Sequence, residues 1–375
     1  MMIRKTYHGL TPRKLFPITE RSIYFNHAGT GPLSIPARRA IEECLGVYTA
    51  QAEFKTEAYF ERIDECRHTV ADFIDATPEE IVFTHNTSQG IYIALMNIPF
   101  ANGDKILVMD EVFPAVRYIV DHNLPQVEKL YVRFADSDPV ERVKPYLGSG
   151  VKAVVLDWVQ YLSGEMVDLE RLSGILKEYG VYLVVDGIQA VGAVPFSART
   201  ADVDFLSSGA AKWLFGPSGA GFLYVNKRTF PKLNRVHAGW LGARWKDFLD
   251  CQTRPALFDD ARMFEQGTRN VIGISALAEN IRMLQAFDIG HVYEHICTLK
   301  ASLREGFESL GFEIVTPARG DQSGIITMKP RERAAALYER FVDNSIVISL
   351  RSGCLRFSPH FYNTQHEVET ILNLL

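Results

Sequence analysis

The sequence of 375 residues is 47% hydrophobic and 23% charged, the composition of a water-soluble globular protein that is long enough for a large domain and a smaller one. A formal net charge of −5 excludes the basic surface typical of nucleic-acid binding, and no apolar run approaches the ~20 residues of a membrane span. Five cysteines, an odd number without metal-ligand spacing, and a first stretch without an apolar signal core favour a cytoplasmic protein with no metal site.

The first elements are expected to be ordinary core helices. A short strand within IYF leads into a loop rich in Gly and Pro, and Ser34 is placed to cap a helix that carries Pro36 in its first turn. A second helix is expected from about residue 57 to 74. Its apolar side chains recur at helical spacing, which burial in a core explains fully.

The segment that follows contains the first candidate binding residues. A strand is expected over residues 81–84, and the next helix carries Thr87 and Ser88 in its first turn. A helix N-terminus offers unpaired N–H groups and the positive end of a dipole, so hydroxyl residues there suit a phosphate. The simpler alternative is that Asn86 or Thr87 only caps the helix.

Buried strands alternate with helices as far as residue 225, which predicts an α/β protein with a mostly parallel, doubly wound sheet. Asp168 is expected to cap one of these helices. Phe113 follows a strand end, where an aromatic side chain is either packed or part of a site. The expected strands lie at residues 105–109, 152–158, 181–185 and 204–207.

The most informative stretch runs from residue 181 to 225. Asp186 directly follows a buried strand, at the sheet edge where ligands bind in open α/β sheets, although it could instead be a helix N-cap. Lys212 lies between Ala211 and Trp213 with no acidic neighbour in sequence. A lysine whose pKa is lowered by burial is a Schiff-base nucleophile, and pyridoxal 5'-phosphate (PLP) is the cofactor that combines such a lysine with an aspartate on its ring nitrogen.

These residues also carry a family resemblance. Two segments carry it, VDGIQAVG and AAKWLFGPSGAGFLYV, and the lysine of the second comes 26 positions after the aspartate of the first. This pattern resembles the class V aminotransferases and cysteine desulfurase-like enzymes of PLP fold type I. The resemblance extends over nearly the whole chain, and the C-terminal segment RFSPHFYNT is similar to that of isopenicillin N epimerase-like members.

The resemblance implies a role for each candidate residue. Lys212 would carry PLP and move the substrate proton, and Asp186 would hold the ring nitrogen. Gln189 would bind the ring hydroxyl and Phe113 would stack on the ring. The implied phosphate ligands are Thr87, Ser88 and Thr268, the last reaching the phosphate of the partner subunit in a homodimer whose active sites lie at the interface.

The implied substrate site lies in the termini. Arg356 would clamp the substrate carboxylate, since a planar guanidinium suits a carboxylate, and Arg351 is its rival. Asn26 and Ala28 in the first loop are further substrate-binding candidates. The expected domains are a PLP-binding large domain of residues 21–265 and a small domain of residues 1–20 and 266–375 that includes a long connecting helix.

Three departures from the family pattern affect the predicted site. Gly209 and Ala211 stand where many relatives have serine and histidine, so Ser207 or Ser208 is the candidate replacement at the phosphate. Trp158, with Gln160 close by, stands where desulfurases often carry an asparagine. Arg351 and Arg356 are only five positions apart, which leaves no room for the loop that carries the desulfurase nucleophile.

Cys354 lies between these arginines, and it is either a reactive thiol or a buried structural cysteine. We therefore expect an aminotransferase acting on a small amino acid. The alternatives are a carbon–sulfur lyase or desulfurase, an epimerase, and a cofactor-binding module without catalysis.

Overall fold

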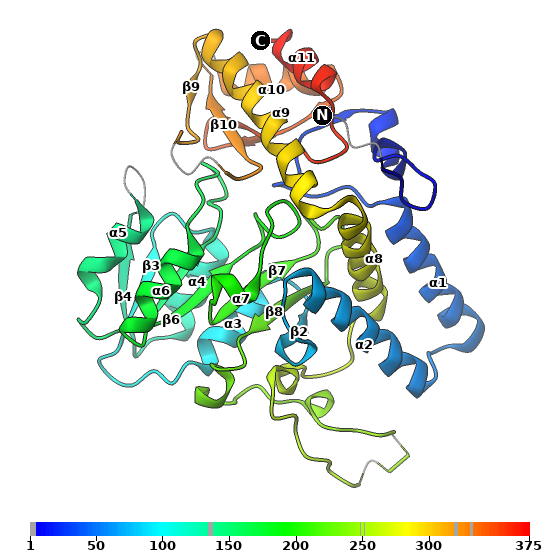
Figure 1. Cartoon of the computed structure of the whole chain (residues 1–375), viewed down its shortest axis with the longest axis vertical. Coiled ribbons are helices and arrows are strands. Elements are labelled where there is room, and N and C mark those ends of the chain that lie inside the picture. The colour runs from blue at the N-terminus through cyan, green and yellow to red at the C-terminus, as the bar shows by residue number, and fades with distance from the viewer. Residues whose placement is uncertain (1–4, 134–137, 248, 251, 319–321, 331–332) are drawn as a thin grey trace.

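The computed structural model describes residues 5–133, 138–247, 249–250, 252–318, 322–330 and 333–375. A seven-stranded sheet forms its centre, in the order β2-β8-β7-β6-β5-β3-β4 (Figure 1). Strand β8 is antiparallel to both of its neighbours, whereas the remaining pairs are parallel. The predicted mostly parallel α/β fold is thus confirmed. The strands are β2 Ile81–Thr84, β3 Lys105–Met109, β4 Glu128–Val132, β5 Val151–Asp157, β6 Tyr182–Asp186, β7 Phe205–Gly209 and β8 Gly221–Val225.

Helices cover this sheet, and several begin at a side-chain cap that local sequence rules predict. Ser34, Asn86 and Asp168 each accept a backbone N–H at the start of the helix that follows. Helix α3 packs on β6, β7 and β8, while α1 and α2 pack on α8. The bounds are α1 Ile35–Gln51, α2 Thr56–Phe73, α3 Thr87–Asn97, α4 Pro114–Asn123, α5 Pro139–Val143, α6 Leu169–Glu178, α7 Ala198–Ala201 and α8 Val271–Phe287.

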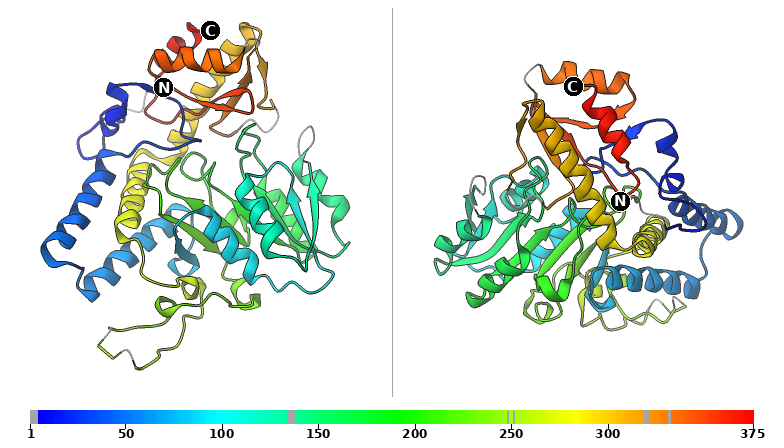
Figure 2. Two further views of the ribbon diagram at one scale, coloured as in Figure 1. Left: turned by 180° about the vertical axis from the view of Figure 1, so that it is seen from behind. Right: turned by 45° about the horizontal axis from the view of Figure 1, so that its top comes forward.

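The C-terminal part forms a smaller unit around an antiparallel sheet of order β12-β13-β10-β9. A separate strand, β1 (Ile23–Tyr24), pairs in parallel with β11 (Ile346–Val347). The N-terminal segment therefore lies beside the C-terminal unit, as both views of Figure 2 show. The other elements are α9 Ile289–Ser309, β9 Glu313–Ile314, β10 Ile326–Lys329, α10 Ala334–Asp343, β12 Ser349–Arg351, β13 Cys354–Phe357 and α11 Gln365–Leu372.

Seven short 3-10 helices complete the described secondary structure. Most of them lie in the loops that connect the elements above. They are η1 Arg13–Leu15, η2 Pro17–Glu20, η3 Pro78–Glu80, η4 Lys144–Tyr146, η5 Phe230–Lys232, η6 Trp240–Gly242 and η7 Ala261–Phe264.

Two hydrophobic clusters accompany the two sheets. The larger one fills the space around the central sheet and includes the buried face of α8, whereas the smaller one includes Phe25 and the C-terminal half of α9. The expected domain boundaries at residues 20 and 265 stay predictions. The long connecting helix that the resemblance implies is broken at Asp288, whose φ of 69° ends α8 and whose side chain caps α9.

No helix within the described ranges is both long and apolar enough to cross a membrane. In the same residues there is no group of three or more His, Cys, Asp or Glu side chains able to hold a metal ion.

Candidate active site

Two carboxylates and a lysine meet at the carboxyl edge of the central sheet. Asp157 and Asp186 are the last residues of β5 and β6, and they are paired in register, so their side chains leave the sheet side by side. Lys212 follows β7, the neighbour of β6, and its charge interacts with both carboxylates. Residues that are 26 and 55 positions from the lysine in sequence thus share one site.

The environment of Lys212 favours a neutral amine. Burial lowers its pKa to about 8, and the nearby Arg356 and Arg351 act in the same direction, whereas Asp186 and Asp157 oppose the shift. Near neutral pH, Lys212 is therefore unprotonated in a minor fraction of the molecules. The unprotonated amine is the form that attacks a carbonyl carbon.

Asp186 keeps a negative charge at the bottom of this site. Burial raises its pKa to about 6, while the N–H of Ile188, 2.9 Å from its Oδ1, and the charge of Lys212 both lower the pKa. The carboxylate is thus predominantly ionised at pH 7. A buried anion of this kind stabilises a cationic ring nitrogen placed against it.

Asp157 is a site residue that the sequence analysis missed. Its side chain is 3% exposed, and its Oδ2 accepts the backbone N–H of Phe113 at 3.0 Å. Its Oδ1 has no hydrogen-bond partner among the described residues. Burial and the neighbouring Asp186 raise the pKa of this carboxyl well above its usual range. The signal was present, because Asp157, like Asp186, directly follows a buried apolar run.

The raised pKa predicts how the stability of the cofactor-free protein depends on pH. A carboxyl that holds its proton more tightly in the folded state makes folding less favourable as pH rises from about 4. Asp157→Asn keeps an acceptor for Phe113 and removes this titration. We expect the urea midpoint of the wild type to fall more between about pH 5 and about pH 8 than that of Asp157→Asn, as tryptophan fluorescence would show.

The matched control is Asp72→Asn, which alters an exposed carboxylate on α2. It should follow the wild-type pH dependence. Both pH values lie above the range in which Glu265 titrates, because its two arginine partners hold the pKa of Glu265 at about 2. Equal pH dependence in the wild type and Asp157→Asn would show that Asp157 is not the titrating group.

Phe113 lies where the sequence places it, at the rim beyond β3. Its ring centroid is 5.6 Å from Lys212 Nζ and 5.4 Å from the ring of Tyr161, which it meets edge to face. The ring is 41% exposed, so one part of it remains available to a flat ligand. Because Asp157 holds the Phe113 backbone, the carboxylate edge and the aromatic rim are linked by a direct hydrogen bond.

The start of α3 packs against the end of β7. The loop of residues 210–220, called the lysine loop because it carries Lys212, follows this strand. Ser207 Oγ donates to the carbonyl oxygen of Thr87 at 3.0 Å, and a Cβ added to Gly209 would lie 3.3 Å from Thr87 Oγ1. Gly209 therefore lets the end of β7 approach the helix N-terminus closely, with little room for a larger residue. Asn86 supplies the cap, because its Oδ1 accepts the Gln89 N–H at 2.9 Å. This leaves the hydroxyls of the first turn for another partner.

Three predicted phosphate ligands have different surroundings. Ser88 is half-buried in the first turn of α3, whereas Ser208 is buried and its Oγ donates to the Gly209 carbonyl at 3.4 Å. Thr268 is exposed and lines a cavity of about 280 Å³ together with His85 and Gln89. Their contacts with a phosphate, and that of Thr268 across a dimer interface, stay predictions.

Gln189 connects the lysine loop to the N-terminal loop. Its side-chain oxygen accepts the indole N–H of Trp213 at 3.0 Å, and its amide nitrogen donates to the carbonyl oxygen of Ala28 at 3.0 Å. Gly31 also lies against the lysine, because a Cβ there would be 2.0 Å from the Lys212 carbonyl oxygen. Gln189 thus keeps one amide hydrogen for the predicted contact with a ring hydroxyl.

Two buried histidines that sequence reasoning missed connect the N-terminal loop and the lysine loop to the C-terminal segment. The ring nitrogens of His27 lie 2.7 Å from the carbonyl oxygen of Ser358 and 2.7 Å from the hydroxyl of Tyr362. His360 Nε2 lies 3.3 Å from the carbonyl oxygen of Trp213. Burial lowers the pKa of both rings, that of His27 to about 3, so they are neutral and position the lysine loop.

Arg356 is the buried one of the two arginines predicted to bind the substrate carboxylate. It is 2% exposed and donates hydrogen bonds to the carbonyl oxygen of Tyr161 and to Ser349 Oγ. Burial and the charge of Arg351 lower the pKa of Arg356 to about 10. Its Nε has no hydrogen-bond partner among the described residues. Asn26 accepts the Ser349 hydroxyl at 2.5 Å and so belongs to the same cluster. Arg351 is exposed, which distinguishes the two candidate clamps.

Cys354 occupies a tight hairpin instead of a long loop. Arg351 pairs with Cys354 across β12 and β13, and only Ser352 and Gly353 form the turn, with φ values of 49° and 74°. The side chain of Cys354 is buried, and burial raises the pKa of its thiol. The structure thus places this cysteine on a paired strand, without an activated thiolate.

A family model and known proteins match this chain over most of its length. The family model described as Aminotransferase class-V matches residues 23–371. The chain belongs to this family. It is 24% identical to the uncharacterized aminotransferase YcbU of Bacillus subtilis, over 95% of this chain and 94% of that protein. It is 27% identical to a probable cysteine desulfurase of Pyrococcus abyssi, over 97% of this chain and 96% of that protein.

Solved structures share the fold of this class V family member. A structure of C-DES with glycine covalently linked to its PLP cofactor superposes with a TM-score of 0.90 at 22% identity, covering 96% of this chain and 98% of that chain. Membership of the class V family makes the chain a PLP-dependent protein, and the superposition shows that it has fold type I. This confirms the cofactor and the fold that the motifs predict.

The residues of the site fit this cofactor. Asp186 offers an ionised carboxylate for the ring nitrogen, and Lys212 offers an amine with a lowered pKa for the aldehyde. The exposed part of Phe113 suits the ring face, and the N–H groups and hydroxyls in the first turn of α3 suit the phosphate. Each chemical group of PLP thus finds a matching group of this chain.

Proposed function

We propose that this chain is an aminotransferase that acts on a small amino acid, with Lys212 as the residue that carries PLP and transfers the proton. The observation that carries this proposal is the lysine itself, a buried amine with a pKa of about 8 between an anionic edge and a cationic edge. Such an amine both bonds to an aldehyde and exchanges a proton near neutral pH.

Each neighbouring group has a role in this scheme. When bound, PLP supplies the electron sink that makes the substrate Cα proton acidic. Asp186 stabilises positive charge on the ring nitrogen, and Lys212 accepts the Cα proton and returns it to a carbon atom. Arg356 orients the substrate by its carboxylate, while Asn26 and Ala28 border the substrate from the N-terminal loop.

Thr268 completes the phosphate site of a second copy in a homodimer. A solution mass near 42.3 kDa, the mass of one chain, would contradict that part of the proposal.

The hairpin of β12 and β13 favours transamination over desulfuration. A cysteine desulfurase that works through a nucleophilic cysteine needs a thiolate that reaches the substrate sulfur, whereas Cys354 is buried on a strand with a raised pKa. A carbon–sulfur lyase or an epimerase needs no such cysteine. Both use the same lysine chemistry and are therefore the alternative activities of this site.

A single-turnover experiment separates these activities. The PLP-loaded protein is mixed with alanine, serine, cysteine or glutamate in amounts equal to the active sites, without an acceptor. Transamination yields one 2-oxo acid per site and pyridoxamine 5'-phosphate. Release of pyruvate with ammonia or sulfide while the cofactor stays in the PLP form would identify a lyase, and loss of optical activity alone would identify an epimerase.

The assignment of Arg356 predicts a defect in substrate binding. Arg356→Ala should raise KM for the amino acid by about 10- to 100-fold, the cost of losing hydrogen bonds to a charged group, with little change in the affinity for PLP. Steady-state kinetics and cofactor titration measure the two effects. The matched control is Arg351→Ala, which removes the exposed neighbour and should change KM less. A larger effect of Arg351→Ala would assign the clamp to Arg351.

A further inference from the structure

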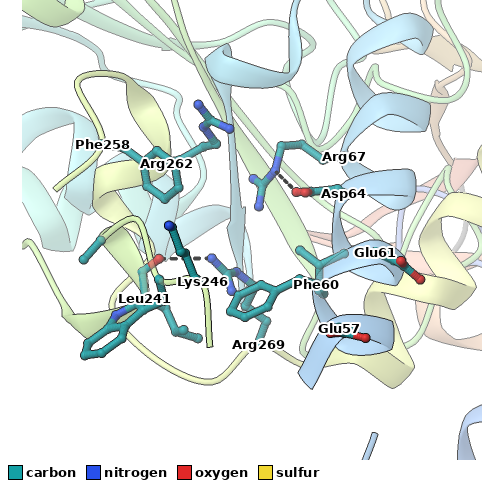
Figure 3. Close-up of a pocket in the computed structure, with 13 residues that line it drawn as sticks. Glu57, Phe60, Glu61, Asp64, Arg67, Leu241, Lys246, Phe258, Arg262 and Arg269 are labelled. Atoms are coloured by element: carbon teal, nitrogen blue, oxygen red, sulfur yellow. Dashed lines mark hydrogen bonds and ion pairs between the residues drawn. The ribbon is translucent and has the colours of Figure 1, made fainter. Parts of the chain in front are cut away.

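A further cavity lies between α2, residues 241–246 and residues 258–269, and neither Lys212 nor Asp186 is among its lining residues, although Arg269 also lines the cavity that contains Thr268. Its volume is about 330 Å³. Figure 3 shows cationic side-chain ends gathered around this space, those of Arg67, Arg262, Arg269 and Lys246. Nothing in the proposed transamination uses these residues.

The floor of the cavity contains two buried arginines that share one carboxylate. The side chains of Arg67 and Arg269 are 3% and 7% exposed. Arg67 binds both oxygens of Glu265, at 2.6 and 3.0 Å, and Arg269 Nε donates to one of the same oxygens. The backbone N–H of Phe83 donates to the other at 2.8 Å. Each oxygen of Glu265 thus accepts two hydrogen bonds, and its capacity is used.

This arrangement leaves positive charge and donors without a match. Two guanidinium groups face a single carboxylate, so one positive charge remains in the floor. Arg67 Nε and Arg269 Nη1 have no hydrogen-bond partner among the described residues. Asp64 approaches Arg67 Nε only to 3.8 Å, and its side chain is 64% exposed. Buried charged N–H groups without acceptors are costly, so the floor favours an anionic ligand.

The walls and the mouth limit what that anion can be. Arg262 is already paired with Asp260 and lies over the ring of Phe258 at 4.3 Å, and Phe60 lines the opposite side. The mouth combines Lys246 with the acidic side chains of α2, Glu57 and Glu61 among them. Aromatic walls favour an apolar body, while the acidic mouth opposes a second negative charge.

We propose that this cavity is a binding site for a small monocarboxylate with an apolar or aromatic body. The carboxylate lies on the donors of Arg67 and Arg269, one negative charge matches the unmatched positive charge, and the body packs between Phe60 and Phe258. Phosphate and dicarboxylates fit less well because their additional charge faces the acidic side chains of α2.

Calorimetric titration of the PLP-loaded protein with benzoate tests the proposal. We expect saturable binding that is weaker by about tenfold or more in Arg269→Gln, since one hydrogen bond to a charged group is lost. Lys246→Glu changes an exposed residue at the mouth, leaves the floor intact, and should also weaken binding. Lys232→Glu makes the same change of charge at an exposed position outside the cavity and should leave the affinity for benzoate unchanged.

A fourth variant separates this site from the proposed active site. Benzoate that binds at the substrate clamp would lose affinity in Arg356→Ala, whereas benzoate in the cavity would not. The proposal is overturned if no saturable binding occurs, if Lys246→Glu and Lys232→Glu bind alike, if Arg356→Ala abolishes binding, or if inorganic phosphate binds as tightly as benzoate.

Discussion

Replacing Lys212 with alanine is expected to reduce turnover by roughly 10⁴-fold, because the variant loses both the amine that bonds to the cofactor and the group that moves the substrate proton. The absorbance band of covalently attached PLP should disappear as well, whereas free PLP remains. Stopped-flow kinetics with the active amino acid and an absorbance spectrum measure the two effects.

The fold should tolerate this change. Asp186 and Asp157 would lose their cationic neighbour, but burial already raises the pKa of both carboxyls, so they can take up a proton instead. Lys232→Ala, at an exposed position, is the matched control and should keep wild-type activity. A Lys212→Ala protein that retained substantial turnover would remove this lysine from the mechanism.

The second large effect is expected for Asp186→Asn. Asparagine keeps an oxygen for the Ile188 N–H at the position where the carboxylate accepts it now, but it has no charge to hold a proton on the ring nitrogen. Loss of such a preorganised electrostatic contact should lower kcat by about 10²- to 10³-fold. Asp168→Asn is the control, because Asn caps a helix as well as Asp does.

The two variants of the carboxylate pair should differ from each other. Burial and the charge of Asp186 raise the pKa of Asp157 well above its usual range, which favours its neutral form, so Asp157→Asn should change kcat less than Asp186→Asn. Comparable losses of activity in both variants would mean that the charge needed for catalysis is shared between the two residues instead of residing on Asp186.

Local rules predicted much of the fold from the sequence. The caps at Ser34 and Asp168 depend on a few consecutive residues, as does the capping box of Thr364 and Glu367. The position of Asp186 at a strand end also followed from a local pattern, the buried run before it. Such features require no knowledge of distant contacts.

The features that sequence reasoning missed depend on distant partners. His27 contacts Ser358 across 331 positions, and Glu265 neutralises Arg67 across 198. No local periodicity encodes either pair. The break at Asp288 was hidden for a related reason, because the apolar spacing continues on both sides of it and only the left-handed backbone at that residue separates the helices.

The candidate site shows the same division. The motif placed Lys212 and Asp186 together, but Asp157 became a candidate only when the register of β5 and β6 set it beside Asp186. The difference between Arg351 and Arg356 likewise depends on burial, which the sequence alone did not reveal.

Reduction of the PLP-loaded protein with borohydride, followed by proteolysis and mass spectrometry, identifies the lysine that carries PLP. We expect the pyridoxyl mass on the peptide that contains Lys212, with one label per chain. A label on another lysine, or none on a protein that contains bound PLP, would contradict the assignment of this site.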